Sequence, residues 1–220
     1  MKAVCIVQAR MGSKRLPGKI MMDLCGWPVL EHVLTRALLI KGIDKVVLAL
    51  PDHPDSDEPA QVAANLNVSV VYGPEDDVLK RYVIAARKYG ADLVMRITAD
   101  CPLLDPEIAS FVLQGIVDSR TDYCSNVHPR SWEKGLDVEV FTRWALEAAH
   151  RDATKKKDRE HVTPWIIDNP IFSMSNVAAS ESHDVELNWS VDTQEDLDRV
   201  RAEFNRRYPN DEVSAGSNAT

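Results

Sequence analysis

The sequence predicts an α/β fold with three layers, in which helices cover both faces of a mainly parallel sheet. Short runs rich in β-branched residues alternate with longer stretches whose apolar residues recur at helical spacing. The runs themselves are almost continuously apolar, as is typical of strands buried on both faces. Because 220 residues are enough for one sizeable core and few for two, one domain is the starting expectation.

Four runs are the expected strands of this sheet. They are AVCIVQA at 3–9, KVVLAL at 45–50, VSVVYG at 68–73 and LVMRITAD at 93–100. A helix that joins two strands of one sheet makes a right-handed crossover, so these strands should be parallel. Sheets of this kind bind ligands outside the carboxyl ends of their strands, and functional residues are therefore expected just after each run.

Three helices are expected in the first half of the chain. The first covers 28–41, where a proline suits the first turn and apolar residues line one face. Asp76 or Asp77 can cap the second helix, and Gly90 should end it. A third helix should follow Pro106. These helices provide the crossovers that a parallel sheet requires.

The alternation changes after about residue 120. A polar segment, the strand-like GLDVEVF at 135–141 and a charged stretch precede an expected late strand, LNWSVDT at 187–193. We interpret 120–170 as an excursion that leaves the sheet and returns to it, within one domain that covers 1–208. Residues 209–220 are small and polar without apolar periodicity, which predicts a disordered tail.

Composition limits the classes of partner. The formal net charge of −8 argues against general affinity for nucleic acid or for an anionic membrane surface. No apolar run reaches the ~20 residues that span a bilayer and no secretory signal begins the chain, so a cytoplasmic protein without membrane insertion is expected. The cysteines form no CxxC pair and no zinc-ligand spacing, which favours reduced, buried thiols.

A cationic loop directly follows the first expected strand. Its glycines permit close backbone approach to a ligand, and its basic side chains can offset the charge of phosphate groups. The loop has neither the Walker A pattern nor the GxGxxG fingerprint, which excludes those two phosphate-binding folds. A solvated basic turn is the alternative interpretation. The residues concerned are Arg10, Gly12, Ser13, Lys14, Arg15, Gly18 and Lys19.

Two aspartates are candidates for a metal site. Asp100 closes the strand at 93–100 and Asp192 closes the expected late strand, so both should project into the same crevice. Magnesium takes one or two protein carboxylates and completes its shell with phosphates and water, which suits such a pair. Alternatively, Asp100 caps a turn before Pro102, and Asp192 caps a helix that begins near Gln194.

The string QARMGSKRLPGK at 8–19 resembles the nucleotide loop of the sugar-activating cytidylyltransferases. The resemblance is to the branch of spore coat polysaccharide biosynthesis and acylneuraminate cytidylyltransferase-like proteins, which are related to CMP-octulosonate synthetases. It continues in the family's order through EDDVLKRY, RITADCPLLD, GLDVEVF, REHVTP and SVDTQEDL, and so covers nearly the whole chain. It implies a Rossmann-like nucleotidyltransferase fold of the α/β/α type and a homodimer formed through the 120–170 excursion.

The resemblance also implies roles for individual residues. Arg15, Lys19 and Asp100 would act in the transfer step, whereas Lys14 would face water. Arg81 would lie near the pyrimidine, although an ordinary helix-surface arginine would give the same pattern. The nucleotide-binding positions as a group are Gln8, Ala9, Arg10, Gly12, Ser13, Arg15, Lys19, Arg81 and Asp100.

The acceptor side rests on two further segments. Asp137 and Glu139 alternate with apolar residues, which points both carboxylates to one face of a strand. That face could line a sugar pocket or simply be half exposed. The resemblance places Arg159, Glu160 and His161 near the acceptor, at the start of a helix, where Arg159 could pair bidentately with a sugar carboxylate. A buried His161 beside a surface charge cluster is the alternative.

Together these features predict an enzyme that transfers CMP from CTP to an acidic sugar, an octulosonate or a nonulosonate, for surface polysaccharide biosynthesis. Pyrophosphate would be released, and Mg²⁺ held by Asp100 and Asp192 would be the cofactor. Positioning and charge stabilisation would supply most of the acceleration. One alternative is a nucleotidyltransferase with another nucleotide or a phosphorylated alcohol acceptor. The other is a non-catalytic nucleotide-binding partner protein.

Overall fold

The computed structural model describes residues 1–208, so the predicted tail at 209–220 lies outside the described residues. The strands are β1 (Ala3–Gln8), β2 (Asp23–Leu24), β3 (Trp27–Pro28), β4 (Lys45–Pro51), β5 (Ser69–Gly73), β6 (Leu93–Thr98), β7 (Tyr123–Ser125), β8 (Glu139–Thr142) and β9 (Met174–Asn176). The α-helices are α1 (Val29–Leu38), α2 (Asp57–Asn65), α3 (Val78–Tyr89), α4 (Pro106–Ser119), α5 (Arg143–Asp152), α6 (Lys156–His161), α7 (Pro164–Ile167) and α8 (Gln194–Arg207). Two short 3-10 turns are η1 (Lys19–Met21) and η2 (Pro54–Ser56). None of these helices is long and apolar enough to cross a membrane.

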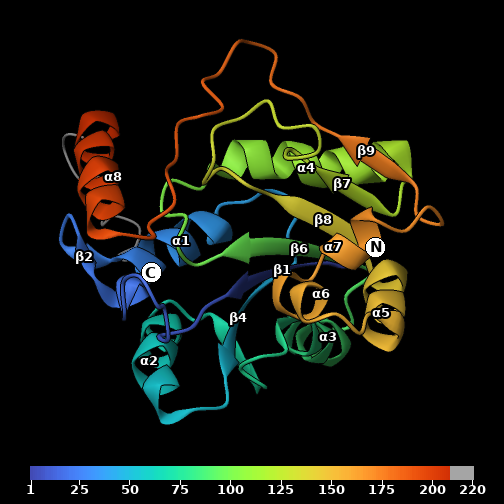
Figure 1. The fold of residues 1–220 in the computed structure, drawn as a ribbon, viewed down its shortest axis with the longest axis horizontal. Helices are drawn as coiled ribbons and strands as arrows, with labels where there is room; N and C mark the ends of the chain where they lie inside the picture. The colour runs from blue at the N-terminus through green and yellow to red at the C-terminus, as the bar shows by residue number, and fades with distance from the viewer. Residues whose placement is uncertain (209–220) are drawn as a thin grey trace.

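Seven strands form one sheet in the order β5-β4-β1-β6-β8-β7-β9. β1 lies between β4 and β6 and pairs in parallel with both. β8 runs antiparallel to both of its neighbours, whereas β9 pairs in parallel with β7. Figure 1 shows α3, α5 and α6 on one side of the sheet and α4 on the other. The predicted three-layer α/β/α fold with a mainly parallel sheet is confirmed.

The predicted helix boundaries follow local capping. The side chain of Asp77 accepts a hydrogen bond from the backbone N–H of Lys80 and so caps α3. Gly90 ends that helix at a φ of 63°, in the left-handed region that glycine adopts without strain. Asp105 caps α4 just before Pro106. Each of these helix ends therefore lies at a residue whose side chain caps the helix or whose backbone adopts a left-handed conformation.

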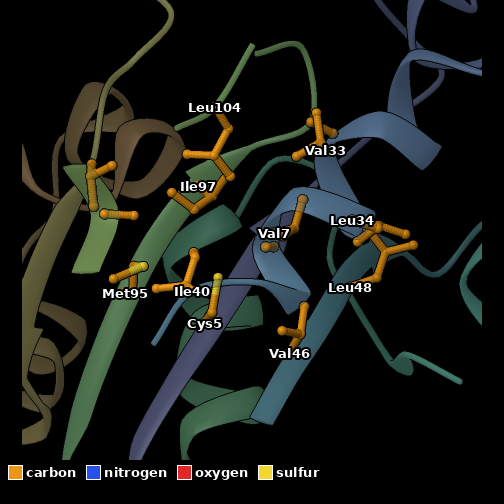
Figure 2. Close-up of a cluster of buried hydrophobic side chains, with 14 of the residues drawn as sticks. Cys5, Val7, Val33, Leu34, Ile40, Val46, Leu48, Met95, Ile97 and Leu104 are labelled. Carbon is orange, nitrogen blue, oxygen red and sulfur yellow. The ribbon is translucent and has the colours of Figure 1, made fainter. Parts of the chain in front are cut away.

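Alternate residues of β1 face the two helical layers. Cys5 and Val7 belong to a buried cluster with residues of α1, α2 and α4, including Val33 and Leu34 (Figure 2). Val4 and its alternate neighbours on the strand belong to a second cluster with α3 and α5. Burial on both faces stabilises the fold by about 25 cal/mol per Å² of apolar surface. Packing on both faces therefore holds the end of β1 in place, and the cationic loop begins there.

A third cluster attaches α8 to the rest of the molecule. Leu197, Val200 and Phe204 of α8 share it with Leu24 of β2 and with Val29, the first residue of α1. Figure 1 shows α8 at one end of the sheet, close to β2. The segment that leads into α8 is thereby fixed at its far end.

The predicted late strand at 187–193 is wrong, because this segment forms no strand. The backbone N–H groups of Lys134 and Trp189 donate to Leu187 and Lys134 respectively, and that of Val191 donates to the carbonyl of Asp100. The segment therefore takes its backbone partners from two different loops. A segment of alternating polar and apolar residues that lies between two loops has no neighbouring strand with which to form a ladder.

Arg159, Glu160 and His161 end α6 rather than begin a helix, which corrects the prediction for this stretch. The helix begins earlier because the N–H of Arg159 and that of Asp158 both donate to the carbonyl of Lys155. Val162 follows with a φ of 72° and breaks the helix before α7. The three side chains thus lie in a last helical turn.

Candidate active site

A cleft of about 680 Å³ opens at the carboxyl ends of β1 and β6. These ends lie side by side, because Gln8 pairs with Thr98. Most of the residues predicted for the site line this cleft: Gln8, Ala9, Arg10, Ser13, Arg15, Lys19, Arg81, Asp100, Asp137, Glu160, His161 and Asp192. Three predicted residues do not line it: Gly12, Glu139 and Arg159.

The cleft carries a local excess of positive charge in a chain of net charge −8. Its lining contains eight lysine and arginine side chains and four aspartate and glutamate side chains. Lys14 is one of the eight, and its side chain is exposed, as expected from the resemblance. A cleft with this balance attracts a polyanionic ligand.

Lys19 joins the two predicted aspartates. Its Nζ donates to Asp100 at 2.6 Å and to Asp192 at 2.9 Å. Burial lowers the pKa of Lys19, but the charges and hydrogen bonds of the two carboxylates outweigh it, and the pKa is raised. Burial raises the pKa of Asp100, but pairing with Lys19 outweighs that effect and lowers it. Lys19 and Asp100 therefore form a charged pair at neutral pH.

Three separate elements place these groups. Gly18, with a φ of 69°, turns the loop so that Lys19 begins η1. Asp100 follows β6, and its carbonyl accepts the N–H of Val191, which holds the incoming segment beside it. Asp192 precedes Thr193, the N-cap of α8. The predicted convergence of the two aspartates is therefore observed, although a helix cap places Asp192 and not a strand end.

The two carboxylates could hold a metal ion. Within residues 1–208 no group of three or more His, Cys, Asp or Glu side chains could do so. Magnesium, however, commonly uses one or two carboxylates and completes its shell with substrate phosphates and water. Because Asp100 and Asp192 already converge on one cationic group, their oxygens fit such a role.

The cationic loop is itself hydrogen-bonded. The N–H groups of Ser13 and Gly18 both donate to the carbonyl of Met11, which closes the loop on itself. Arg15 forms an ion pair with Asp192 at 2.9 Å, although its side chain is 65% exposed. Gly12 lies outside the cleft lining, and a Cβ on it would lie 3.1 Å from Oε1 of Glu75. The loop is thus a formed structure with exposed cationic ends.

Arg81 is buried at the wall of the cleft. Its Nη1 donates to the carbonyls of Pro74 and Glu75, at 2.8 and 3.0 Å. Its Nε has no hydrogen-bond partner among the described residues, and burial lowers the pKa of its guanidinium. Arg81 is therefore not the ordinary surface arginine of the alternative interpretation.

Asp137 and Glu139 face a second cavity of about 400 Å³. Asp137 pairs bidentately with Arg130, at 2.7 and 2.9 Å. Glu139 accepts from Arg96 at 2.5 Å and from the hydroxyl of Tyr123 at 2.7 Å. The two cavities share Arg96, Arg130, Asp137 and His161, so the second cavity adjoins the first.

Arg159 lies outside both cavities, which argues against the expected pairing with a sugar carboxylate. Its guanidinium pairs bidentately with Asp77, at 3.1 and 2.5 Å, and donates to the carbonyl of His150. The contacts attach α6 to the N-terminus of α3. The neighbouring Glu160 does line the cleft, and it pairs with Arg10 at 3.4 Å.

Several lining residues were not predicted from the sequence: Arg96, Thr98, Arg130, Lys134, Gly135, Asn188 and Ser190. Among them, Gly135 could have been noticed in the sequence, because a glycine directly before the strand-like LDVEVF can indicate a turn or a close backbone approach. It has a φ of 91°, and a Cβ there would lie 2.6 Å from the carbonyl carbon of Trp189. Close approach of two loops thus requires glycine at this position.

A mainly parallel sheet, with a cationic loop at its carboxyl edge facing paired carboxylates, defines the nucleotidyltransferase class of α/β proteins. The model of one family in this class, described as cytidylyltransferase, matches residues 4–217. The chain belongs to the cytidylyltransferase family.

Individual relatives agree with this assignment. The chain is 28% identical to the spore coat polysaccharide biosynthesis protein SpsF of Bacillus subtilis (strain 168), over 96% of this chain and 89% of that protein. It is 32% identical to a 3-deoxy-manno-octulosonate cytidylyltransferase of Escherichia coli, over 53% of this chain and 47% of that enzyme. A cytidylyltransferase structure from Leptospira borgpetersenii matches with a TM-score of 0.86 and 28% identity, covering 100% of this chain and 98% of that one.

Proposed function

We propose that this cytidylyltransferase transfers CMP from CTP to an acidic sugar and releases pyrophosphate. The observation that carries the proposal is the convergence of Asp100 and Asp192 on Lys19, in a cleft with excess positive charge. Family membership supports CTP as the donor. Relatives named for spore coat polysaccharide biosynthesis and for octulosonate transfer support a sugar acceptor.

In the proposed reaction, the anomeric hydroxyl of the sugar attacks the α-phosphorus of CTP in line. A new bond joins the sugar oxygen to phosphorus, and the hydroxyl proton is released to solvent water. The bond from phosphorus to the bridging oxygen breaks, and pyrophosphate leaves with its electron pair. Arg15 and Lys19 stabilise the charge that develops on the phosphate oxygens. Arg10 and Ser13 orient the triphosphate from the same loop.

Mg²⁺ is the proposed cofactor, with Asp100 and Asp192 as its protein ligands. When bound, the ion would neutralise phosphate charge and lower the pKa of a bound hydroxyl, which offsets the lack of an evident general base. The chain's own contribution is to hold the two carboxylates together at the end of β6 and at the N-terminus of α8.

The acceptor would lie where the two cavities meet. Asp137 and Glu139, each already paired with an arginine, present fixed polar groups that suit sugar hydroxyls. Glu160 and His161 face the same region from the end of α6. We therefore propose an ulosonate or nonulosonate acceptor, bound without help from Arg159.

The test is pyrophosphate release with CTP and a panel of acidic sugars, in the variants Asp100→Asn and Asp192→Asn. Each should lose about 100-fold or more in kcat, since charge stabilisation of this kind commonly contributes that much. Asp198→Asn is the matched control, because Asp198 is an exposed carboxylate on α8 whose partners within residues 1–208 are Arg201 and Gln194. Near-normal turnover of either site variant, with circular dichroism unchanged, would defeat the assignment.

A further inference from the structure

The ammonium of Lys19 closes the carboxylate pair in the described structure. Nζ lies 2.6 Å from Asp100 and 2.9 Å from Asp192, and the side chain is only 11% exposed. Arg15 reaches the second oxygen of Asp192 from the solvent side. The cation site of the proposed enzyme is thus already filled by a cation of the chain itself.

We propose that Lys19 is an internal counter-ion of the nucleotide-free protein, and that a divalent cation enters this site only together with a nucleoside triphosphate. The inference rests on the proposed function, in which Asp100 and Asp192 hold the metal. It adds a second role for Lys19, which precedes its role in transfer.

A metal that binds without nucleotide would leave the ammonium of Lys19 without an anionic partner. A divalent cation bound by both aspartates must separate the ammonium from its two partners. A largely buried ammonium without an anionic partner is unfavourable, and so is a like charge placed a few ångströms away. Entry of the metal alone is therefore opposed twice by the same side chain.

A triphosphate removes both obstacles. Arg10, Ser13 and Arg15 line the same cleft as Lys19, so phosphates bound by this loop lie within the reach of its ammonium. Lys19 would then exchange carboxylate oxygens for phosphate oxygens, and the aspartates would become free for the metal. By linkage, the nucleotide and the metal each raise the affinity of the site for the other.

The exchange needs no movement of the backbone. The N–H of Lys19 donates to the carbonyl of Leu16, and the N–H of Met22 donates to the carbonyl of Lys19, which holds the residue in η1. The lysine side chain has several rotatable bonds and a compact charge, so it can turn between two sets of oxygens about a fixed Cα.

The experiment measures Mn²⁺ binding to the whole chain without nucleotide, by electron paramagnetic resonance and calorimetry. Lys19→Met should bind Mn²⁺ at least about tenfold more tightly than the wild type, because it removes the ammonium that competes with the metal for the two carboxylates. Lys14→Met is the matched control. Lys14 lies in the same loop and the same cleft, is exposed and forms no ion pair within residues 1–208, so its loss should change the affinity by less than about twofold.

Lys19→Gln covers the case in which the methionine variant fails to fold. Its amide can still donate to one carboxylate but carries no charge, and it should also bind Mn²⁺ more tightly than the wild type. Equal affinity of the wild type and both Lys19 variants would overturn the counter-ion proposal, while Mn²⁺ binding with CTP would leave the proposed function standing. Absence of Mn²⁺ binding in every variant, with and without CTP, would overturn both.

Discussion

Gly135 is the residue at which one added methyl group should harm the site most. It lies where the loop before β8 meets the segment 187–193. In that segment, Asp192 stands three residues after Trp189. A Cβ would lie 2.6 Å from the carbonyl carbon of Trp189 and 2.7 Å from the nitrogen of Ser190, both backbone atoms. We expect Gly135→Ala to lower the free energy of unfolding by about 2–4 kcal/mol, from positive φ and overpacking together.

Gly26→Ala separates these two contributions. Gly26 has a φ of 94°, close to the 91° of Gly135, but nothing lies within 4 Å of its Cβ position. This control should cost only about 1 kcal/mol. Gly135→Ala should also lower kcat by about tenfold or more, because it displaces the segment that carries Asp192. Urea unfolding and pyrophosphate release measure the two effects, and equal losses in the two variants would contradict the steric explanation.

Arg159 should act on stability and not on the acceptor. Its pairing with Asp77 is bidentate and partly buried, and Asp77 also caps α3. We expect Arg159→Met to lower the free energy of unfolding by about 2–3 kcal/mol, the usual range when a charged, hydrogen-bonded partner is lost. The acceptor KM should change by less than about twofold.

Arg151→Met is the control for this prediction. Arg151 pairs bidentately with Asp152, but its side chain is 71% exposed, so its removal should change stability little. A large rise in the acceptor KM for Arg159→Met, with stability unchanged, would instead restore the carboxylate-binding role expected from the sequence.

At the scale of elements, an ion-paired carboxylate of α8 predicts how the stability of the protein depends on pH. Glu203 accepts hydrogen bonds from Arg206 and Arg207, and these lower its pKa from 4.5 to about 2. A carboxyl whose pKa is lower in the folded state stabilises the protein above its unfolded pKa, and that contribution is lost as the pH falls. Glu203→Gln should therefore destabilise the protein at pH 7, and the difference should shrink as the pH falls from about 4.5 towards 2.

Urea unfolding at several pH values tests this expectation. Glu181→Gln is a suitable comparison, because Glu181 is exposed and forms no ion pair within the described part of the chain. A difference for Glu203→Gln that stays constant or grows on acidification would contradict the assigned pairing.

Elements with local signals could be predicted, and elements that depend on distant partners could not. Asp77, Gly90 and Pro106 mark helix ends through their own side chains or backbone freedom, so their positions were evident in the sequence. The segment 187–193 alternates polar and apolar residues as a strand does, but its backbone partners lie in two loops far away in the chain. α2 begins at Asp57 in a proline-flanked stretch where no helix was expected.

The site shows the same division. Topology predicts that residues after parallel strands meet at one edge, so Lys19 and Asp100 could be brought together from the sequence alone. The partners of Arg159 could not, because nothing in the spacing shows that Asp77 approaches from α3. Arg96 and Arg130 were also missed, since pairing with Glu139 and Asp137 depends on the excursion returning to the sheet.

At the scale of the whole molecule, the far edge of the sheet predicts self-association. β9 pairs only with β7 among the described residues, which leaves its other edge open. Ile171 and Met174 are 60% and 51% exposed there, and Trp144, 55% exposed, packs on the adjacent Phe172. An open edge bordered by apolar side chains favours pairing with another chain.

We therefore expect a homodimer that uses the excursion and the strand that follows it. Light scattering over a range of concentrations should give the dimer mass for the wild type and the monomer mass for Ile171→Glu with Met174→Glu, because two charges in a desolvated interface oppose association. Leu39→Glu is the control, since Leu39 is 64% exposed at the end of α1, away from β9 in the sheet order. It should remain dimeric.

A wild-type monomer at micromolar concentration, or equal dissociation by the control, would show that this edge is not the interface. Retained transfer activity in the monomeric variant would further show that one chain supplies the complete site.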